Sequence, residues 1–94
     1  MTVITINEEC HGFIGIAKDM RSAFDFLLSD KWITEKTEFP IEADDDSDFV
    51  TLEDLRKRFE CDNLLDTLVF MWEDNEQWFE GLFYFYTETV YEST

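Results

Sequence analysis

Carboxylates are the side chains of this sequence whose number and spacing most suggest chemistry. Their densest run is Asp44-Asp45-Asp46-Ser47-Asp48. The glycine usual at position 6 of a calcium loop is Ser47 here, and Pro40 argues against an entering helix. These two departures disfavour calcium binding, so we expect neither a metal site nor a cofactor. A calcium-responsive binding module centred on residues 42–53 is kept only as an alternative. The spacing behind that alternative places acids at loop positions 1, 3, 5, 7 and 12, namely Glu42, Asp44, Asp46, Asp48 and Glu53.

A catalytic centre would need different groups. His11 is the single histidine of the chain and follows Cys10, while Cys61 lies far away in the sequence. Adjacent residues of a strand point to opposite faces, so Cys10 and His11 make a poor nucleophile–base pair unless they lie in a turn. The sequence has no glycine-rich phosphate loop and no CxxC or HExxH metal motif. We therefore expect a protein that is not an enzyme and that carries two reduced cysteines.

Charge is distributed unevenly along the chain. Residues 1–42 hold eight acids and four bases, whereas residues 43–94 hold fifteen acids and three bases, so most of the net charge of −16 lies in the second half. Solubility of a small domain needs a net charge of only about 2–8 in magnitude, and concentrated like charge destabilises a compact fold. We therefore predict an acidic partner-binding surface, formed by Asp44, Asp45, Asp46, Asp48, Glu53, Asp54, Glu73, Asp74, Glu76 and Glu80.

An acidic surface of this kind favours one class of partner. DNA carries one negative charge per roughly 1.7 Å of helix axis, and a protein studded with carboxylates can imitate that array in a basic channel. Direct binding of nucleic acid is disfavoured, because phosphate contacts need clustered Lys and Arg. The expected partner is a basic nucleic-acid-binding protein or nuclease, with Trp72, Trp78 and Tyr86 as candidate anchors. The alternative is an acidic surface that only keeps an aromatic-rich protein in solution. Homo-oligomerisation is left open.

The pattern of apolar residues predicts the elements that would position these groups. Residues 2–6 are β-branched and residues 13–17 are apolar, which indicates a β-hairpin with a loop of four to six residues. A short edge strand is expected around residues 38–41, followed by a solvated acidic loop over residues 42–48. Asp19 is the expected N-cap of a helix whose apolar face holds Met20, Ala23, Phe24, Leu27 and Leu28.

The second half of the chain is predicted to hold short helices and a final strand. Thr51 begins a capping-box-like sequence before the first of these helices. A single turn follows Asn75 and is closed by Gly81. Residues 82–91 indicate a strand that is apolar on both faces early on, which suits a strand covered on both sides or one at an interface. Asp62 is the expected cap of another helix, whose apolar side holds Leu64, Leu65, Leu68, Val69 and Trp72.

Together these elements predict one α+β domain over residues 1–94, with a small, mainly antiparallel sheet packed with three to four short helices. The N-terminal hairpin and the C-terminal strand are expected to form the sheet. Hydrophobic residues make up 45% of the chain and aromatic residues 17%, which argues against an acidic disordered tail. No apolar run approaches the roughly 20 residues of a membrane span, and the N-terminal residues lack a basic n-region. We therefore expect a cytoplasmic protein without a membrane partner.

As a whole, the chain resembles the small acidic anti-defence proteins of phages and mobile elements, among them anti-CRISPR proteins that mimic DNA. The resemblance covers the length, the charge and the acidic second half, and it includes no diagnostic motif, so no family residue is carried over. It implies a non-catalytic inhibitor in the host cytoplasm that binds a basic protein, such as a CRISPR effector nuclease, through an acidic surface and blocks DNA recognition. Immunity proteins that neutralise basic nuclease toxins are similar too and are the nearest alternative.

Overall fold

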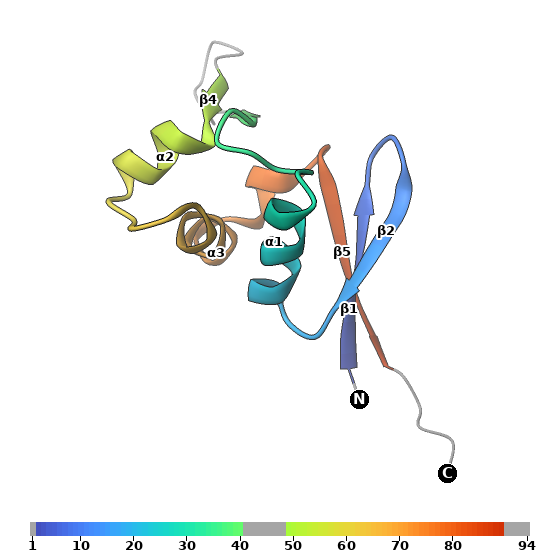
Figure 1. The fold of residues 1–94 in the computed structure, drawn as a ribbon. Coiled ribbons are helices and arrows are strands. Elements are labelled where there is room, and N and C mark those ends of the chain that lie inside the picture. Colours follow the sequence, from blue (N-terminus) through green and yellow to red (C-terminus); the bar gives the residue numbers. More distant parts are fainter. Residues whose placement is uncertain (1, 41–48, 90–94) are drawn as a thin grey trace.

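The computed structural model describes residues 2–40 and 49–89 of the chain. The first, second and last strands form an antiparallel sheet, and two short strands form a separate two-stranded sheet (Figure 1). The α+β fold predicted from the sequence is confirmed. The elements follow one another as β1 (Thr2–Glu8), β2 (Gly12–Ala17), α1 (Met20–Ser29), β3 (Glu38–Pro40), β4 (Phe49–Thr51), α2 (Leu52–Arg58), α3 (Leu64–Asp74), the 3-10 helix η1 (Glu76–Phe79) and β5 (Phe83–Thr89).

β1 is the central strand of the three-stranded sheet, with β2 and β5 antiparallel on either side. The predicted N-terminal hairpin is confirmed, but its loop spans only residues 9–11 instead of four to six residues. Glu8 stabilises the shorter loop, because its Oε2 accepts hydrogen bonds from the backbone N–H groups of Cys10 (3.1 Å) and His11 (2.8 Å). Gly12 closes the turn at φ +73°, a conformation that glycine adopts without strain.

α1 begins and packs as predicted. The Asp19 carboxylate accepts a hydrogen bond from the backbone N–H of Ser22 (2.7 Å), which satisfies an amide that has no partner within the helix. The helix approaches β2 at Gly15, where an added Cβ would lie 3.0 Å from the Phe26 ring. Glycine at this position therefore sets how closely α1 lies on the sheet. The predicted apolar face is turned into the core, with Ala23, Phe24 and Leu27 buried.

The predicted edge strand is present as β3, and it pairs with β4, which the sequence did not reveal. β4 is three residues long and directly precedes α2, so it is too short for an alternating pattern to be recognised. Thr51 ends β4 and caps α2, because its hydroxyl accepts a hydrogen bond from the backbone N–H of Asp54 (3.2 Å). The acidic loop expected over residues 42–48 lies outside the described residues.

α3 differs from the prediction in its cap and in its most buried face. Asn63, not Asp62, is the N-cap, and its side-chain oxygen accepts a hydrogen bond from the backbone N–H of Asp66 (2.8 Å). Thr67 is fully buried, and its hydroxyl is satisfied because it donates to the Asn63 carbonyl (2.8 Å). A polar residue at this buried position hid the true face of the helix from the apolar pattern. Leu68 and Met71 are also fully buried, while four predicted residues pack partly exposed against the core: Leu64, Leu65, Val69 and Trp72.

The predicted turn between α3 and the last strand is η1. Asn75 ends α3 and caps η1, since its side-chain oxygen accepts a hydrogen bond from the backbone N–H of Gln77 (2.9 Å). Gly81 follows at φ +83°, the left-handed conformation expected of a glycine that closes a helix. The chain then enters β5, which pairs with β1 from Phe83 to Thr89 without a bulge.

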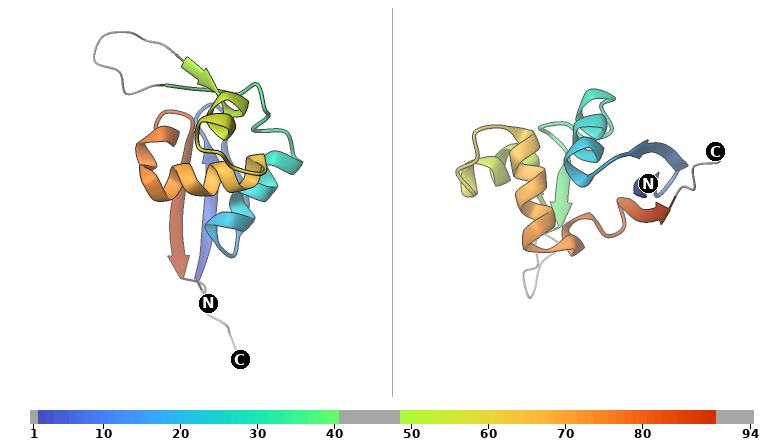
Figure 2. Two further views of the ribbon diagram at one scale, coloured as in Figure 1. Left: turned by 90° about the vertical axis from the view of Figure 1, so that its left-hand side faces the viewer. Right: turned by 90° about the horizontal axis from the view of Figure 1, so that it is seen from below.

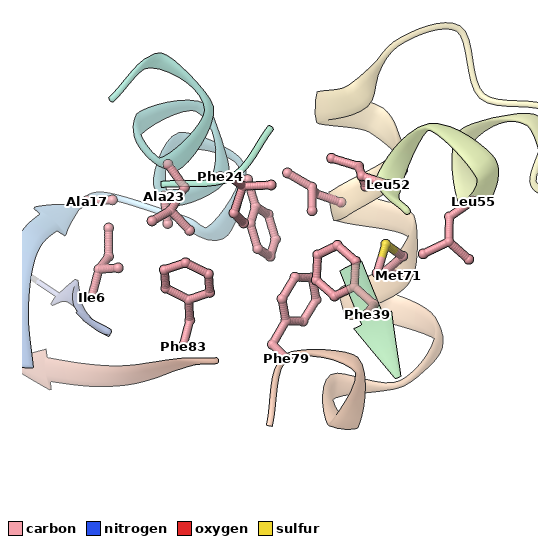
Figure 3. Close-up of a cluster of buried hydrophobic side chains, with 13 residues drawn as sticks. Ile6, Ala17, Ala23, Phe24, Phe39, Leu52, Leu55, Met71, Phe79 and Phe83 are labelled. Carbon is pink, nitrogen blue, oxygen red and sulfur yellow. The ribbon is translucent and has the colours of Figure 1, made fainter. Parts of the chain in front are cut away.

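The core runs from the three-stranded sheet to the helices at the other end of the protein (Figure 3). Phe79 of η1 lies in the middle, with its ring centroid 5.1 Å from that of Phe24 and 5.6 Å from that of Phe39. Phe24 belongs to α1 and Phe39 to β3, and the ring of Phe85 in β5 lies 6.1 Å from that of Phe79, so this aromatic cluster joins both sheets. η1 is therefore held firmly by its buried side, which fixes the position of the residues that it exposes.

Helices pack on only one face of the three-stranded sheet in the described part of the chain (Figures 1 and 2). Phe85 points to the covered face, where its ring lies 5.2 Å from that of Trp72. Strand alternation and register turn the neighbouring tyrosines to the opposite face, which we call the outer sheet face. It carries four large exposed side chains, Phe13 (60% exposed), Ile16 (60%), Tyr84 (38%) and Tyr86 (54%). The last strand, predicted to be apolar on both faces, is thus covered on one of them.

Candidate functional site

The structure separates the acids that the sequence grouped into one surface. Asp44, Asp45, Asp46 and Asp48 lie outside the described residues, as does most of the calcium-loop spacing. Two of the remaining six, Glu53 and Asp54, lie in the first turn of α2. The other four, Glu73, Asp74, Glu76 and Glu80, lie together at the end of α3, in η1 and directly after it.

Glu53 is engaged within α2. Its carboxylate accepts two hydrogen bonds from Arg56 Nε (3.0 and 3.1 Å) and one from Arg56 Nη2 (2.7 Å), while Arg56 Nη1 donates to the Cys61 carbonyl (3.0 Å). These bonds to Arg56 lower the pKa of Glu53 below its ordinary value of 4.5. A partner or a cation would have to compete with the guanidinium for this carboxylate. Glu53 and Asp54 thus lie in the first turn of α2, where negative side chains interact favourably with the helix dipole and stabilise the helix.

Residues 73–80, which we call the acidic segment, have no such local use. Glu73, Asp74, Glu76 and Glu80 are exposed, and none of them forms an ion pair within the described residues. Nine acids and no Lys, Arg or His follow Arg58, so a basic partner for these acids could come only from earlier in the chain, as Arg21 does for Asp66 (3.0 Å). The segment is nevertheless held in place, because Asn75 caps η1 and the side chain of Phe79, at the end of η1, is buried in the core.

The helix dipole makes the position of Glu73 and Asp74 unfavourable. They occupy the last turn of α3, where the unpaired carbonyls carry partial negative charge, and this turn has no basic residue. By contrast, the last turn of α2 holds Arg56, Lys57 and Arg58, which suit a helix C-terminus. Residues that oppose stability at an exposed place are candidates for function. α1 also lacks a base in its last turn and ends at one acid, its C-cap Asp30, whereas the last turn of α3 itself holds two acids.

A groove of about 260 Å³ lies beside the acidic segment. Its lining includes four consecutive residues of β5, from both faces of the strand, and no residue of β1, so it runs along the edge of β5 that faces away from β1. The lining holds two carboxylates and no base. Its residues come from α3, η1, the turn after η1 and β5, namely Trp72, Glu76, Gln77, Phe79, Glu80, Phe83, Tyr84, Phe85 and Tyr86.

The three predicted aromatic anchors differ in their surroundings. Trp72 is partly buried against the Phe24 and Phe85 rings and lines the groove with its exposed part. Trp78 also packs partly buried against the core, and it is not among the groove residues. Tyr86 is the most exposed of the three and borders both the groove and the outer sheet face. Trp72 and Tyr86 are therefore placed to contact a ligand in the groove.

The histidine and the cysteines lie elsewhere. Cys10 and His11 are in the hairpin loop after β1, and both thiols of the chain are free. His11 Nδ1 lies 2.5 Å from Glu8 Oε2, and the imidazole packs edge-on against Trp32 with centroids 5.2 Å apart. The described residues contain no group of three or more His, Cys, Asp or Glu side chains arranged to hold a metal ion. His11 therefore has a local partner in Glu8, and nothing in its described contacts directs it to Cys10.

The groove could not be found from the sequence, because it depends on how η1 folds back beside β5. One signal was present: two carboxylates, Glu76 and Glu80, stand just before a strand that is apolar on both faces.

Within residues 2–40 and 49–89, no helix has the length and apolar character that crossing a membrane requires. Searches among protein families, curated proteins and solved structures found nothing that matches this chain.

Proposed function

We propose that this protein is a non-catalytic inhibitor that binds a basic nucleic-acid-binding protein in the cytoplasm and keeps it from its nucleic acid. A CRISPR effector nuclease is a partner of the required chemistry. The observation that carries the proposal is the acidic segment, whose exposed carboxylates have no basic partner among the described residues and lie at the end of α3, in η1 and directly after it, beside the buried Phe79. Carboxylates in that state are available to replace phosphates in a basic groove.

The charge of the whole chain supports the same proposal. A net charge of −16 creates a field that attracts a basic protein over several ångströms and accelerates association at low salt. Such a field is screened within about 10 Å at 0.1 M salt, so binding should depend strongly on ionic strength. An acidic decoy needs no active site, because occupying the basic groove is enough to exclude DNA.

The test is a capture experiment from bacterial lysate at low and high salt with matched charge variants. The first variant, E73Q/D74N/E76Q/E80Q, neutralises the acidic segment. The second, D25N/E35Q/E38Q/E60Q, neutralises four exposed acids elsewhere and has the same net charge, −12 instead of −16. We expect the wild-type protein and the second variant to capture a basic nucleic-acid-binding protein, and the first variant to lose about tenfold or more in affinity.

The captured protein is then purified and bound to a fluorescent DNA duplex. Addition of the inhibitor should release the duplex in proportion to the amount of inhibitor bound. Equal weakening by both variants would reduce the effect to net charge and count against a specific surface. Capture without release of nucleic acid would overturn the proposal. A captured nuclease toxin encoded beside this protein would instead favour the immunity-protein alternative.

A further inference from the structure

The edge of β5 that faces away from β1 is an open sheet edge within the described residues. β5 pairs with β1 along its length, and no described strand lies on its other side. Natural edge strands are usually protected by Lys, Pro or a bulge, because their unpaired N–H and C=O groups can pair with another chain. β5 contains no Lys or Pro, and its pairing with β1 has no register shift.

The groove of about 260 Å³ follows this open edge, so an occupant would lie beside the strand's backbone. An extended peptide can join such an edge as an additional strand, in which main-chain hydrogen bonds give affinity and alternate side chains give specificity. η1 forms the opposite wall of the groove, with Glu76 and Glu80 directed from that side. Tyr84 and Tyr86 line the side that continues into the outer sheet face.

The lining of the groove defines the chemistry of the occupant. It has two carboxylates, no base and several aromatic rings. One of these rings, Trp72, is only partly buried. Arginine suits all three features, because its guanidinium pairs with carboxylates, stacks on aromatic faces and keeps its charge. In a strand, every second side chain would point toward Glu76 and Glu80, so the matching sequence alternates basic and β-branched residues.

A second copy of this chain is a poorer occupant. Each copy carries a net charge of −16 and no base after Arg58, so two copies would bring like charges together at this edge.

We propose that the groove beside the open edge of β5 binds an extended, arginine-rich segment of the partner protein as an added strand. The proposal rests on the proposed function in one respect, that the partner is basic, and it adds where and how the partner is recognised.

The direct test uses two synthetic octapeptides of equal charge. One alternates arginine and valine, and the other alternates arginine and proline, so that every second residue lacks an amide N–H and its ring disfavours pairing within a sheet. Binding is followed by amide hydrogen exchange and by amide chemical shifts of the labelled protein. We expect the arginine–valine peptide to slow exchange at alternate residues of β5 and to shift residues 76–80. The arginine–proline peptide should bind about tenfold more weakly and leave β5 exchange unchanged.

Matched variants test the carboxylates. E76Q/E80Q should weaken binding of the arginine–valine peptide about tenfold, whereas E35Q/E38Q, which removes the same charge from exposed residues outside the groove, should change it by less than about twofold. Tyr86→Ala should weaken the same peptide while leaving the thermal unfolding temperature close to that of the wild type, because Tyr86 is largely exposed.

Three outcomes would overturn the inference. Equal binding of both peptides without slower β5 exchange would mean simple charge attraction. Slow β5 exchange without peptide, together with a doubled mass in solution, would mean that a second copy occupies the edge. Capture of the basic partner that is unaffected by E76Q/E80Q would remove the groove from recognition and leave the proposed function standing. Conversely, strand-like peptide binding without release of nucleic acid by the captured partner would support this inference and contradict the proposed function.

Discussion

At the scale of single residues, Glu8 shows how one carboxylate can organise a loop. Its Oε2 accepts bonds from the amides of Cys10 and His11 and from the His11 ring. These bonds lower the pKa of Glu8 below its ordinary value of 4.5. The bond with the His11 side chain has the largest effect, and the loop amides add to it. A carboxyl group whose pKa is lowered by folding stabilises the folded state above the unfolded pKa, and this contribution is lost as the pH falls through the folded value.

We therefore predict that Glu8→Gln lowers the unfolding temperature at neutral pH and that the difference from the wild type shrinks below about pH 4. The measurement is thermal unfolding by circular dichroism from pH 7 to pH 3. Glu9→Gln is the control, because Glu9 is the exposed neighbour of Glu8 and its substitution removes the same charge. A difference that persists at the lowest pH, or one of equal size in Glu9→Gln, would contradict the role given to Glu8.

At the scale of elements, the two acidic helix ends invite opposite expectations. Glu73 and Asp74 lie in the last turn of α3, where the helix dipole disfavours them, and Asp54 lies in the first turn of α2, where it is favoured. We predict that E73Q/D74N raises stability, by about 0.3–1 kcal/mol for each residue at low salt, and that Asp54→Asn lowers it by a similar amount. Urea unfolding at low and high salt measures both, and the two effects should fade as salt rises.

Shifts of the same sign in the two variants would show that net charge, not helix position, controls these residues. The comparison also bears on the proposed function, because E73Q/D74N should gain stability while it loses affinity for the proposed basic partner. Such an exchange is common where residues are kept for binding at the expense of folding.

The elements that the sequence predicted well are those with several apolar residues in a regular pattern. β1, β2, α1 and β5 were recognisable because their buried positions are occupied by apolar residues at the right period. β4 was missed because three residues carry no period, and the face of α3 was misjudged because buried Thr67 is polar. Of the site, the acids were evident from composition, but the groove was not, since it forms only where residues 72–80 meet β5 in three dimensions.

At the scale of the whole molecule, the net charge should limit stability. Twenty-three acids and seven bases on a chain of 94 residues repel one another, and this repulsion is long-ranged at low ionic strength. The screening length falls from about 30 Å at 0.01 M salt to about 10 Å at 0.1 M. We predict that the unfolding temperature rises steadily with NaCl and that the gain is smaller for E73Q/D74N/E76Q/E80Q.

The measurement is thermal unfolding from about 0.01 to 0.5 M NaCl, because the screening length changes most over this range. An unfolding temperature that stays constant or falls would mean that repulsion is not a major term. Calcium chloride at matched ionic strength separates screening from binding. Additional stabilisation by calcium alone would favour the alternative of a calcium-responsive module centred on residues 42–53.

The absence of bases after Arg58 also has a consequence for chemical labelling. Every lysine of the chain lies between Lys18 and Lys57, so amine-directed reagents cannot react with a side chain of α3, η1 or β5. Carbodiimide activation does the reverse, since it acts on carboxylates such as Glu76 and Glu80. Any amide bond formed there with a lysine must join residues 73–80 either to Lys18, Lys31, Lys36 or Lys57 of the same chain or to another molecule. A zero-length cross-link from residues 73–80 to a lysine of a different protein would therefore identify the proposed partner directly.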